Sequence, residues 1–262
     1  MQNIAIFGVP RSGTSWLGQI FNSSPAVTYR YQPIFAYSFP EVLTEYSTGK
    51  EINSFHQELL ETNDDFVCQK KNISGNNTPQ FDKSEITHLV WKEVRYLNII
   101  ENLIKKSSTK VIGIVRHPCG VLKSWMKAPK EFDSAWRIEE EWRHAAKKNS
   151  GDHEFYGYER WLQAARMFKK LEKTYPEQFK VVTYEGLLDN LAGRIASLFD
   201  FTGITMTKQT QHFLEESTTQ SSDDPYSVFR KDKRGDEWKN ELPMKVIDEI
   251  INDPRYINLK SK

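Results

Sequence analysis

The sequence contains little cysteine, and its cysteines are poorly placed for cross-linking or for binding metal. Cys68 and Cys119 are the two cysteines among 262 residues. One pair at this spacing suggests neither a disulfide framework nor a metal site. His117, His144 and His153 do not have the spacing of metal ligands either. We therefore expect two buried thiols and no bound metal.

The sequence also has no excess of charge of either sign. It contains 36 lysines and arginines and 35 aspartates and glutamates, for a formal net charge of +1. A broad surface for a polyanion is therefore not predicted, and we expect no nucleic-acid partner. A local basic pocket remains compatible with this balance.

Long apolar runs are the third absence. No stretch approaches the roughly 20 apolar residues that a membrane-spanning helix needs. The first apolar run begins at Ile4, and no basic segment precedes it, so no secretory leader is expected. We therefore expect a cytoplasmic protein whose sequons at Asn22, Asn72 and Asn76 are unused.

The apolar runs that are present are short and alternate with amphipathic stretches. This alternation predicts an α/β fold with a P-loop-like central parallel sheet and helices on both faces. We expect strands at 4–8, 88–94, 110–116 and 179–184. We expect helices at 14–21, 97–105, 118–127, 134–148, 154–175, 189–201 and 242–252. No linker divides the chain, so residues 1–262 are expected to form a single domain.

Two stretches do not fit this alternation. Residues 36–84 have weak periodicity and a polar centre, KKNISGNNTPQ. Such a segment often covers a substrate, although a surface loop without a role fits equally well. Residues 217–224 are rich in Ser, Thr, Gln and Asp and predict a mobile loop.

The segment IAIFGVPRSGTSWL (4–17) has the glycine spacing of a phosphate-binding loop, G-x-x-x-x-G-K-[ST]. Between a strand and a helix, backbone N–H groups and the helix N-terminus favour a bound anion. Thr14 stands where the lysine that reaches the β- and γ-phosphates belongs. The loop therefore predicts an anion smaller than a triphosphate, clamped by Arg11. A turn required only for packing is the alternative.

The segment VRHPCGVLKSW (115–125) carries a second candidate anion site. Arg116 ends an expected strand, and Ser124 follows about two turns into the next helix. Ligands of open α/β folds bind at the carboxyl edge of the sheet. We therefore expect Arg116 to bind a second phosphate, or else to form a structural salt bridge.

These segments together resemble the sulfotransferases that use 3′-phosphoadenosine 5′-phosphosulfate (PAPS). PRSGTSWL (10–17) is similar to their 5′-phosphosulfate loop, and RHPCGVLKS (116–124) to their 3′-phosphate segment. VVTYEGLL (181–188), LFDFTG (198–203) and FRKDKRGDEWKN (229–240) resemble three later landmarks, in the order the family has them. The last segment differs from the family at Asp232, which replaces a glycine, and at Glu237, an additional residue.

The resemblance implies a role for individual residues. It implies a loop at 217–236 that closes over the nucleotide, and it places Tyr184 near the adenine. It assigns the 3′-phosphate to Arg116, Ser124 and Arg230. It assigns the 5′-phosphosulfate to Arg11, Ser12, Gly13, Thr14 and Ser15, with Trp16 beside them.

The chemistry of sulfuryl transfer agrees with this assignment. An SO₃ unit moves in line from a phosphate to an acceptor oxygen, and positioning and charge stabilisation carry most of the catalysis. Arg11 would neutralise the charge that develops on the bridging oxygen. The donor has no β,γ-phosphate pair to chelate, so Mg²⁺ is not expected.

The proton acceptor is less clearly indicated. VWKEVRYL (90–97) resembles the Lys-x-Val-Arg strand of carbohydrate sulfotransferases, which aligns Lys92 as catalytic and Arg95 as substrate-binding. Glu93 is the first candidate base. Because neighbouring residues of a strand face opposite ways, Lys92 and Glu93 can both point into the site only if the strand has ended there. His88 is a second candidate base, and the alternative is an ordinary strand histidine without a catalytic role. Gln32 replaces the glutamate of related enzymes and would orient the acceptor.

The sequence therefore predicts a PAPS-dependent sulfotransferase acting on a hydroxyl of a carbohydrate or another small molecule. Two alternatives are a P-loop nucleotide kinase and a non-catalytic protein that binds 3′-phosphoadenosine 5′-phosphate (PAP) or another nucleotide. The oligomeric state is not predicted.

Overall fold

A five-stranded parallel sheet forms the centre of the protein. The computed structural model describes residues 1–40, 42–70, 78–220, 224–229 and 235–260. The strands are β1 (Gln2–Phe7), β2 (Val27–Tyr31), β3 (His88–Glu93), β4 (Lys110–Val115) and β5 (Phe179–Thr183), in the order β2-β3-β1-β4-β5. Every neighbouring pair is parallel, so all five carboxyl ends lie at one edge. The α/β fold with a parallel sheet is confirmed.

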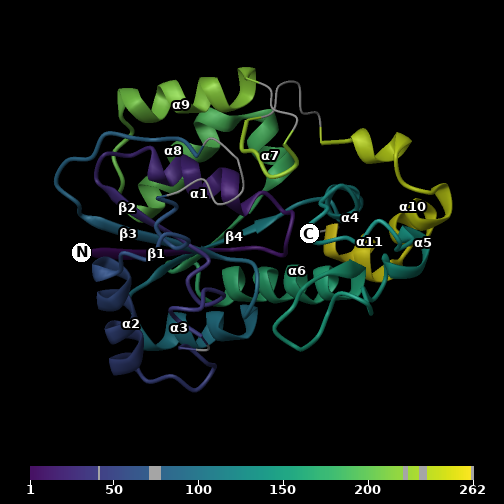
Figure 1. Ribbon diagram of the computed structural model, residues 1–262, viewed down its shortest axis with the longest axis horizontal. Helices are drawn as coiled ribbons and strands as arrows, with labels where there is room; N and C mark the ends of the chain where they lie inside the picture. Colours follow the sequence, from purple (N-terminus) through teal and green to yellow (C-terminus); the bar gives the residue numbers. More distant parts are fainter. Residues whose placement is uncertain (41, 71–77, 221–223, 230–234, 261–262) are drawn as a thin grey trace.

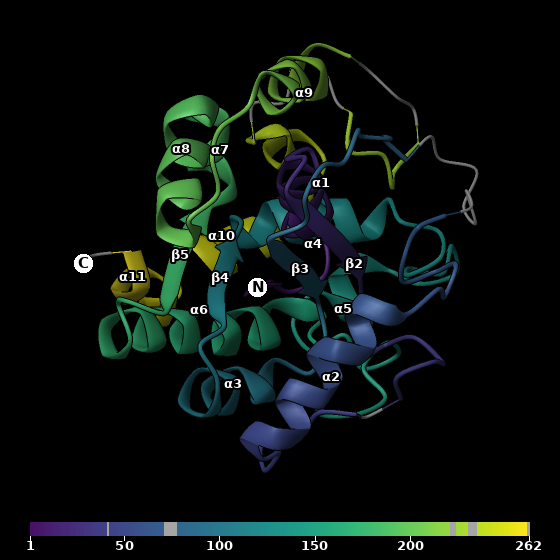
Figure 2. The same cartoon turned by 90° about the vertical axis from the view of Figure 1, so that its left-hand side faces the viewer.

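Helices cover both faces of the sheet, as Figure 1 and the side view in Figure 2 show. One face carries α1 (Thr14–Asn22), α7 (Tyr184–Asp189), α8 (Leu191–Thr202) and α9 (Lys208–Thr219). The other carries α2 (Gly49–Glu61), η1 (Leu97–Ile99), α3 (Ile100–Lys106) and α6 (Gly157–Thr174). Because strand residues alternate, Ile4 and Ile6 pack with the first layer and Ala5 and Phe7 with the second.

The remaining helices gather beyond the carboxyl edge of the sheet, near β4 (Figure 1). They are α4 (Pro118–Met126), α5 (Ile138–Glu141), η2 (Glu237–Asn240), α10 (Met244–Ile251) and α11 (Pro254–Lys260). Trp238 of η2 stacks on His117 at a centroid distance of 4.4 Å, and Tyr256 of α11 meets the same ring edge-on. The C-terminal helices therefore pack against the start of α4.

The prediction of a helix at 134–148 is wrong, because within this range only Ile138–Glu141 are α-helical. The carbonyls of Trp142 and Arg143 accept the N–H groups of Tyr158 and Glu159. These carbonyls therefore satisfy the first turn of α6 and cannot continue a helix of their own. Consequently α6 begins at Gly157 rather than at residue 154.

Regular structure also occurs where the sequence suggested little. Within 36–84, α2 begins with a capping box between Thr48 and Glu51 and buries Phe55 and Leu59 in the core. The T-x-x-E pattern at 48–51 was a usable sequence signal. The strand β2 and the helices α9 and α11 were also missed, and α9 makes residues 217–219 helical rather than part of a loop. Residues 221–223 and 230–234 of the expected closing loop lie outside the described residues.

Candidate active site at the carboxyl edge of the sheet

The turn between β1 and α1 requires both of its glycines. A Cβ at Gly8 would lie 2.4 Å from Ser12 Oγ and 2.8 Å from the carbonyl oxygen of Ile114. Gly13 has a φ of 103°, and a Cβ there would lie 2.7 Å from the ring of Tyr184. A side chain at either position would clash, and Gly13 in addition adopts a positive φ that favours glycine. The turn therefore sits directly against β4 and the start of α7.

Several predicted 5′-phosphosulfate residues have side chains engaged within the protein. The fully buried Ser12 donates from Oγ to the carbonyl of Val9 at 2.7 Å. The Trp16 indole donates to Ser217 at 3.1 Å and ties α1 to α9. Burial raises the pKa of the Tyr31 hydroxyl, and the nearby hydroxyl of Ser15 acts to lower it. The backbone N–H of Ser12 also donates to the carbonyl of Val9, at 3.2 Å, so Ser12 shapes the turn with both its backbone and its side chain.

Arg11 connects the turn to the segment after α4. Its Nε donates to Ser124 Oγ at 3.2 Å, and its Nη1 donates to Glu131 Oε1 at 3.3 Å. Its Nη2 donates to the carbonyl of Pro225 at 2.6 Å, and the guanidinium lies 5.1 Å from the ring centroid of Tyr226. The fold therefore brings together Arg11 and Ser124, two predicted site residues 113 positions apart.

Arg116 leaves β4 beside the same turn, and its guanidinium has unused donors. Its Nη1 donates to the carbonyl of Arg11 at 3.3 Å, while its buried Nε has no hydrogen-bond partner. Within the described part of the chain no carboxylate pairs with it, so the structural salt bridge is not observed. A buried cationic donor without a partner is costly unless an anion satisfies it. This geometry fits a bound phosphate.

Tyr184 packs against both the β1–α1 turn and Arg116. Its buried ring lies 4.3 Å from the Arg116 guanidinium carbon and meets Trp16 edge-on at 5.7 Å. The same ring faces Gly13. The ring therefore fixes the position of Arg116 through a cation–π contact. Proximity of Tyr184 to an adenine stays a prediction.

Lys92 and Glu93 end β3 and are both buried, at 1% and 0% exposure. Lys92 Nζ lies 4.1 Å from the ring centroid of Tyr31, and burial lowers the pKa of Lys92 to about 7. Burial raises the pKa of Glu93 to about 7. Glu93 Oε1 accepts the N–H groups of Ile34 and Phe35 at 2.9 and 3.3 Å, and Oε2 accepts that of Val94 at 3.3 Å. Glu93 therefore holds the turn after β2.

Gln32 and Arg95 flank Lys92 at the same edge. Gln32 has a φ of 41°, and its N–H donates to the carbonyl of Lys92 at 3.0 Å. Left-handed non-glycine residues are uncommon and often mark functional sites. Arg95 pairs with Glu154 at 3.0 Å, and its guanidinium lies 3.9 Å from the ring centroid of Phe35. Both predicted acceptor residues thus lie beside the end of β3.

His88 is not brought to this edge. It is the first residue of β3, whereas Lys92 and Glu93 are the last two, so the length of the strand separates them. Its Nδ1 is hydrogen-bonded to Thr87 at 2.8 Å. We therefore leave His88 out of the proposed site. The remaining predicted residue, Arg230, lies outside the described residues.

Similarity to a known protein family identifies the family of this chain. The family model for the sulfotransferase domain matches residues 2–253, which is nearly the whole chain. This chain belongs to the sulfotransferase domain family. No curated protein sequence matches it.

Three solved structures show the sulfotransferase fold that this chain shares. Mouse sulfotransferase SULT7A1 complexed with PAP is 15% identical with a TM-score of 0.60, covering 100% of this chain and 85% of that chain. Retinol dehydratase in complex with retinol and PAP is 14% identical with a TM-score of 0.55, covering 100% and 83%. A sulfotransferase from Alicyclobacillus acidocaldarius is 14% identical with a TM-score of 0.51, covering 99% and 95%.

Two side chains at the site of this sulfotransferase family member were missed by the sequence analysis. Glu131, in the connection between α4 and α5, contacts Arg11 and accepts a hydrogen bond from the Tyr156 hydroxyl at 3.2 Å. Neither residue belongs to a motif or to a periodic pattern. Only their nearness to Arg11 in the folded chain identifies them.

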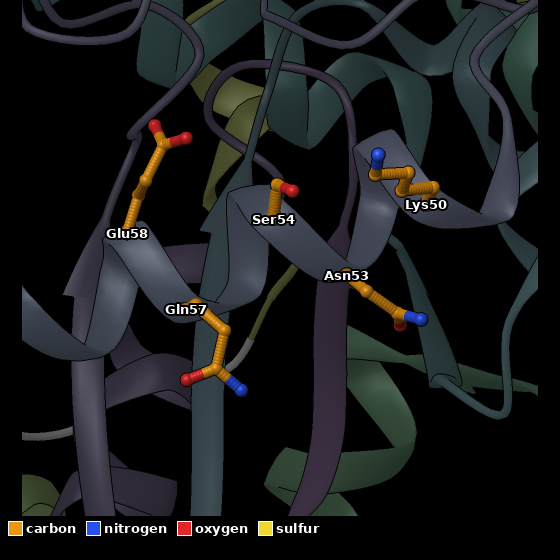
Figure 3. A pocket seen from close by; sticks show the side chains of 5 residues that line it. All are labelled: Lys50, Asn53, Ser54, Gln57 and Glu58. Carbon is orange, nitrogen blue, oxygen red and sulfur yellow. The ribbon is translucent and has the colours of Figure 1, made fainter.

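A separate pocket lies on α2 and is not part of this site. Figure 3 shows that its lining side chains all come from that helix, namely Lys50, Asn53, Ser54, Gln57 and Glu58. The neighbouring His56 contacts Asn3 at the amino end of β1, so this helix lies toward the opposite edge of the sheet. No buried charge faces the pocket from these five residues, and we assign it no function.

In the part of the chain that the structure describes, no three or more His, Cys, Asp or Glu side chains are grouped as metal ligands would be. No helix in the same part of the chain is long and apolar enough to cross a membrane.

Proposed function

We propose that this sulfotransferase family member transfers a sulfuryl group from PAPS to a hydroxyl of a carbohydrate or another small acceptor. The main support for this proposal is that the guanidiniums of Arg11 and Arg116 both lie at the β1–α1 turn. The buried Nε of Arg116 has no hydrogen-bond partner. Two phosphate-bearing groups of one nucleotide would satisfy both guanidiniums. The PAP in the crystals of mouse SULT7A1 and retinol dehydratase supports this choice of donor.

The residues present fit the donor as a bisphosphorylated nucleotide. Arg116 and Ser124 would hold the 3′-phosphate, with Arg230 as a further predicted contact. The backbone N–H groups of residues 13–15 and the side chain of Arg11 would hold the 5′-phosphosulfate. The glycines at 8 and 13 let the turn pack directly against Ile114 and Tyr184, which holds it at the edge of the sheet. PAPS supplies an activated sulfuryl group at this position when it is bound.

The chain's own contribution to transfer is positioning and charge. Arg11 lies at the turn, where it would stabilise negative charge on the phosphate oxygen that leaves sulfur. Lys92 places a second cation at the end of the adjacent strand β3. Gln32 and Arg95, on either side of Lys92, would orient the acceptor hydroxyl for in-line attack.

Calorimetric titration with PAP and with ATP, each with and without Mg²⁺, tests the proposed donor. We expect PAP to bind more tightly than ATP and without dependence on Mg²⁺, because Thr14 replaces the lysine that a triphosphate needs. Mg²⁺-dependent ATP binding without a response to PAP would instead support a nucleotide kinase. PAP binding without transfer of ³⁵S-sulfate to any sugar, phenol or alcohol in a broad panel would support a non-catalytic binding protein.

Lys92 should impose an alkaline limit on activity. Since burial lowers its pKa to about 7, kcat/KM should fall as the pH rises above that value and the cation is lost. A bound anionic donor favours the charged form, so the corresponding fall in kcat should occur at higher pH. Rates of sulfate transfer measured from pH 5.5 to 9 check this.

Lys92→Arg provides the matched variant for this limit. Arginine keeps its proton throughout the range, so the alkaline fall in kcat/KM should disappear even where the maximum rate is lower. An unchanged alkaline fall in Lys92→Arg would show that another group titrates. Lys92→Met, which removes the cation, should be slow at every pH.

A further inference from the structure

Glu131 is a partly exposed carboxylate fixed between the donor turn and the acceptor edge. Its side chain is 21% exposed. Oε1 accepts from Arg11 at 3.3 Å and Oε2 accepts from Tyr156 at 3.2 Å. Its carbonyl accepts the indole N–H of Trp125 at 3.1 Å, so its backbone is held as well. Both the backbone and the carboxylate therefore have defined positions.

The surroundings of Glu131 place it on the acceptor side of Arg11. Its charge acts on Lys92 and on Tyr31, which end the neighbouring strands β3 and β2. Those strand ends carry the residues proposed to orient the acceptor. Burial raises the pKa of the Tyr156 hydroxyl, so this hydroxyl stays protonated and keeps donating to Oε2. Glu131 thus contacts Arg11 and also acts on the strand ends that we propose to orient the acceptor.

Other acidic and imidazole side chains described near this edge have partners within the protein. Both oxygens of Glu93 accept backbone N–H groups, and the side chain has no exposure. Four further examples are Glu154 with Arg95 and Ser150, Glu185 with the N–H of His117, His117 with the N–H of Cys119, and Asp224 with the N–H of Tyr226. Glu131 differs from them because its partner Arg11 is itself required by the donor.

We propose, on the basis of the proposed function, that Glu131 is the proton acceptor of the reaction and that Arg11 occupies it until the donor binds. The guanidinium turns toward the 5′-phosphosulfate, which frees Oε1 while Tyr156 keeps Oε2 in place. The acceptor oxygen forms a bond to sulfur as the bond from sulfur to the phosphate oxygen breaks. The electron pair of the broken bond stays on PAP, and the acceptor proton moves to Glu131. Charge and mass balance without another reactant.

Glu131→Gln separates this proposal from a structural role. We expect turnover, measured as ³⁵S transfer from PAPS to water and to a panel of phenols, to fall about 100- to 1,000-fold. The affinity for PAP, measured by calorimetry, should rise about 2- to 5-fold because no carboxylate competes for Arg11. The loss of turnover should be smallest for the most acidic phenols, which need the least help in losing a proton.

Two carboxyl-to-amide variants serve as comparisons. Glu139→Gln changes a carboxylate on α5 that is 47% exposed and lies 4.0 Å from Arg137, so it should match the wild type in both measurements. Glu93→Gln tests the base predicted from the strand motif. Under our proposal its turnover loss is no larger for weakly acidic phenols than for strongly acidic ones, and its PAP affinity does not rise.

The outcomes distinguish a failure of the role of Glu131 from a failure of the proposed function. Wild-type turnover in Glu131→Gln, or PAP affinity that is unchanged or weaker, would overturn the role of Glu131 and leave the sulfotransferase proposal intact. An acidity-dependent loss in Glu93→Gln alone would return the base to β3. Absence of PAP binding by the wild type would overturn the proposed function itself, and the role of Glu131 with it.

Discussion

Arg116→Ala is expected to weaken PAP binding about 10- to 100-fold and to reduce sulfate transfer to near background. The guanidinium has no carboxylate partner in the described residues, and its buried Nε is unsatisfied. Hydrogen bonds to a charged group contribute about 1.5–3 kcal/mol each, and one such bond accounts for the expected loss. Calorimetry with PAP and a sulfate-transfer assay measure the two effects.

The position of Arg116 predicts that the loss is specific to the 3′-phosphate. The wild type should prefer PAP to adenosine 5′-monophosphate, which lacks that group, and Arg116→Ala should remove most of this preference. Arg137→Ala, an exposed arginine beside α5, is the matched control and should leave both affinities unchanged. Retention of the full preference in Arg116→Ala would place the 3′-phosphate elsewhere.

Arg11→Ala is expected to reduce turnover about 100- to 1,000-fold with a smaller effect on PAP affinity. The proposed work of Arg11 is to stabilise the charge that appears on the phosphate oxygen as sulfur leaves, and removing one such donor typically has an effect of this size. PAP has already lost the sulfate, so its binding depends less on this contact. Single-turnover transfer rates and PAP calorimetry distinguish the two quantities.

Arg11→Lys is the conservative comparison. Lysine keeps the charge but cannot donate to Ser124, Glu131 and Pro225 in the arrangement that the guanidinium has. Its turnover should therefore exceed that of Arg11→Ala and remain below that of the wild type. Equal turnover in the alanine variant and the wild type would remove Arg11 from the proposed chemistry.

Local patterns predicted the centre of the fold correctly. Strands β1, β3, β4 and β5 are short apolar runs bounded by polar or glycine residues, so composition and length alone define them. β2 was missed because VTYRY has charged and half-buried positions at the edge of the sheet. The helix at 134–148 failed because carbonyls of its second half serve α6, a tertiary demand that no local pattern records.

The sequence by itself determined the turn that we propose to bind an anion, because a strand, two spaced glycines, Arg11 and the missing lysine are consecutive features of one segment. It also placed Arg116 and Ser124 at the same edge, since the carboxyl ends of parallel strands coincide. Only the tertiary structure decided which candidate bases are available on the proposed acceptor side. There, Glu93 is enclosed by backbone donors, His88 lies at the far end of its strand, and Glu131 reaches Arg11 from a connection without a motif. Proton transfer depends on access and distance, and these arise only when segments remote in the chain pack together.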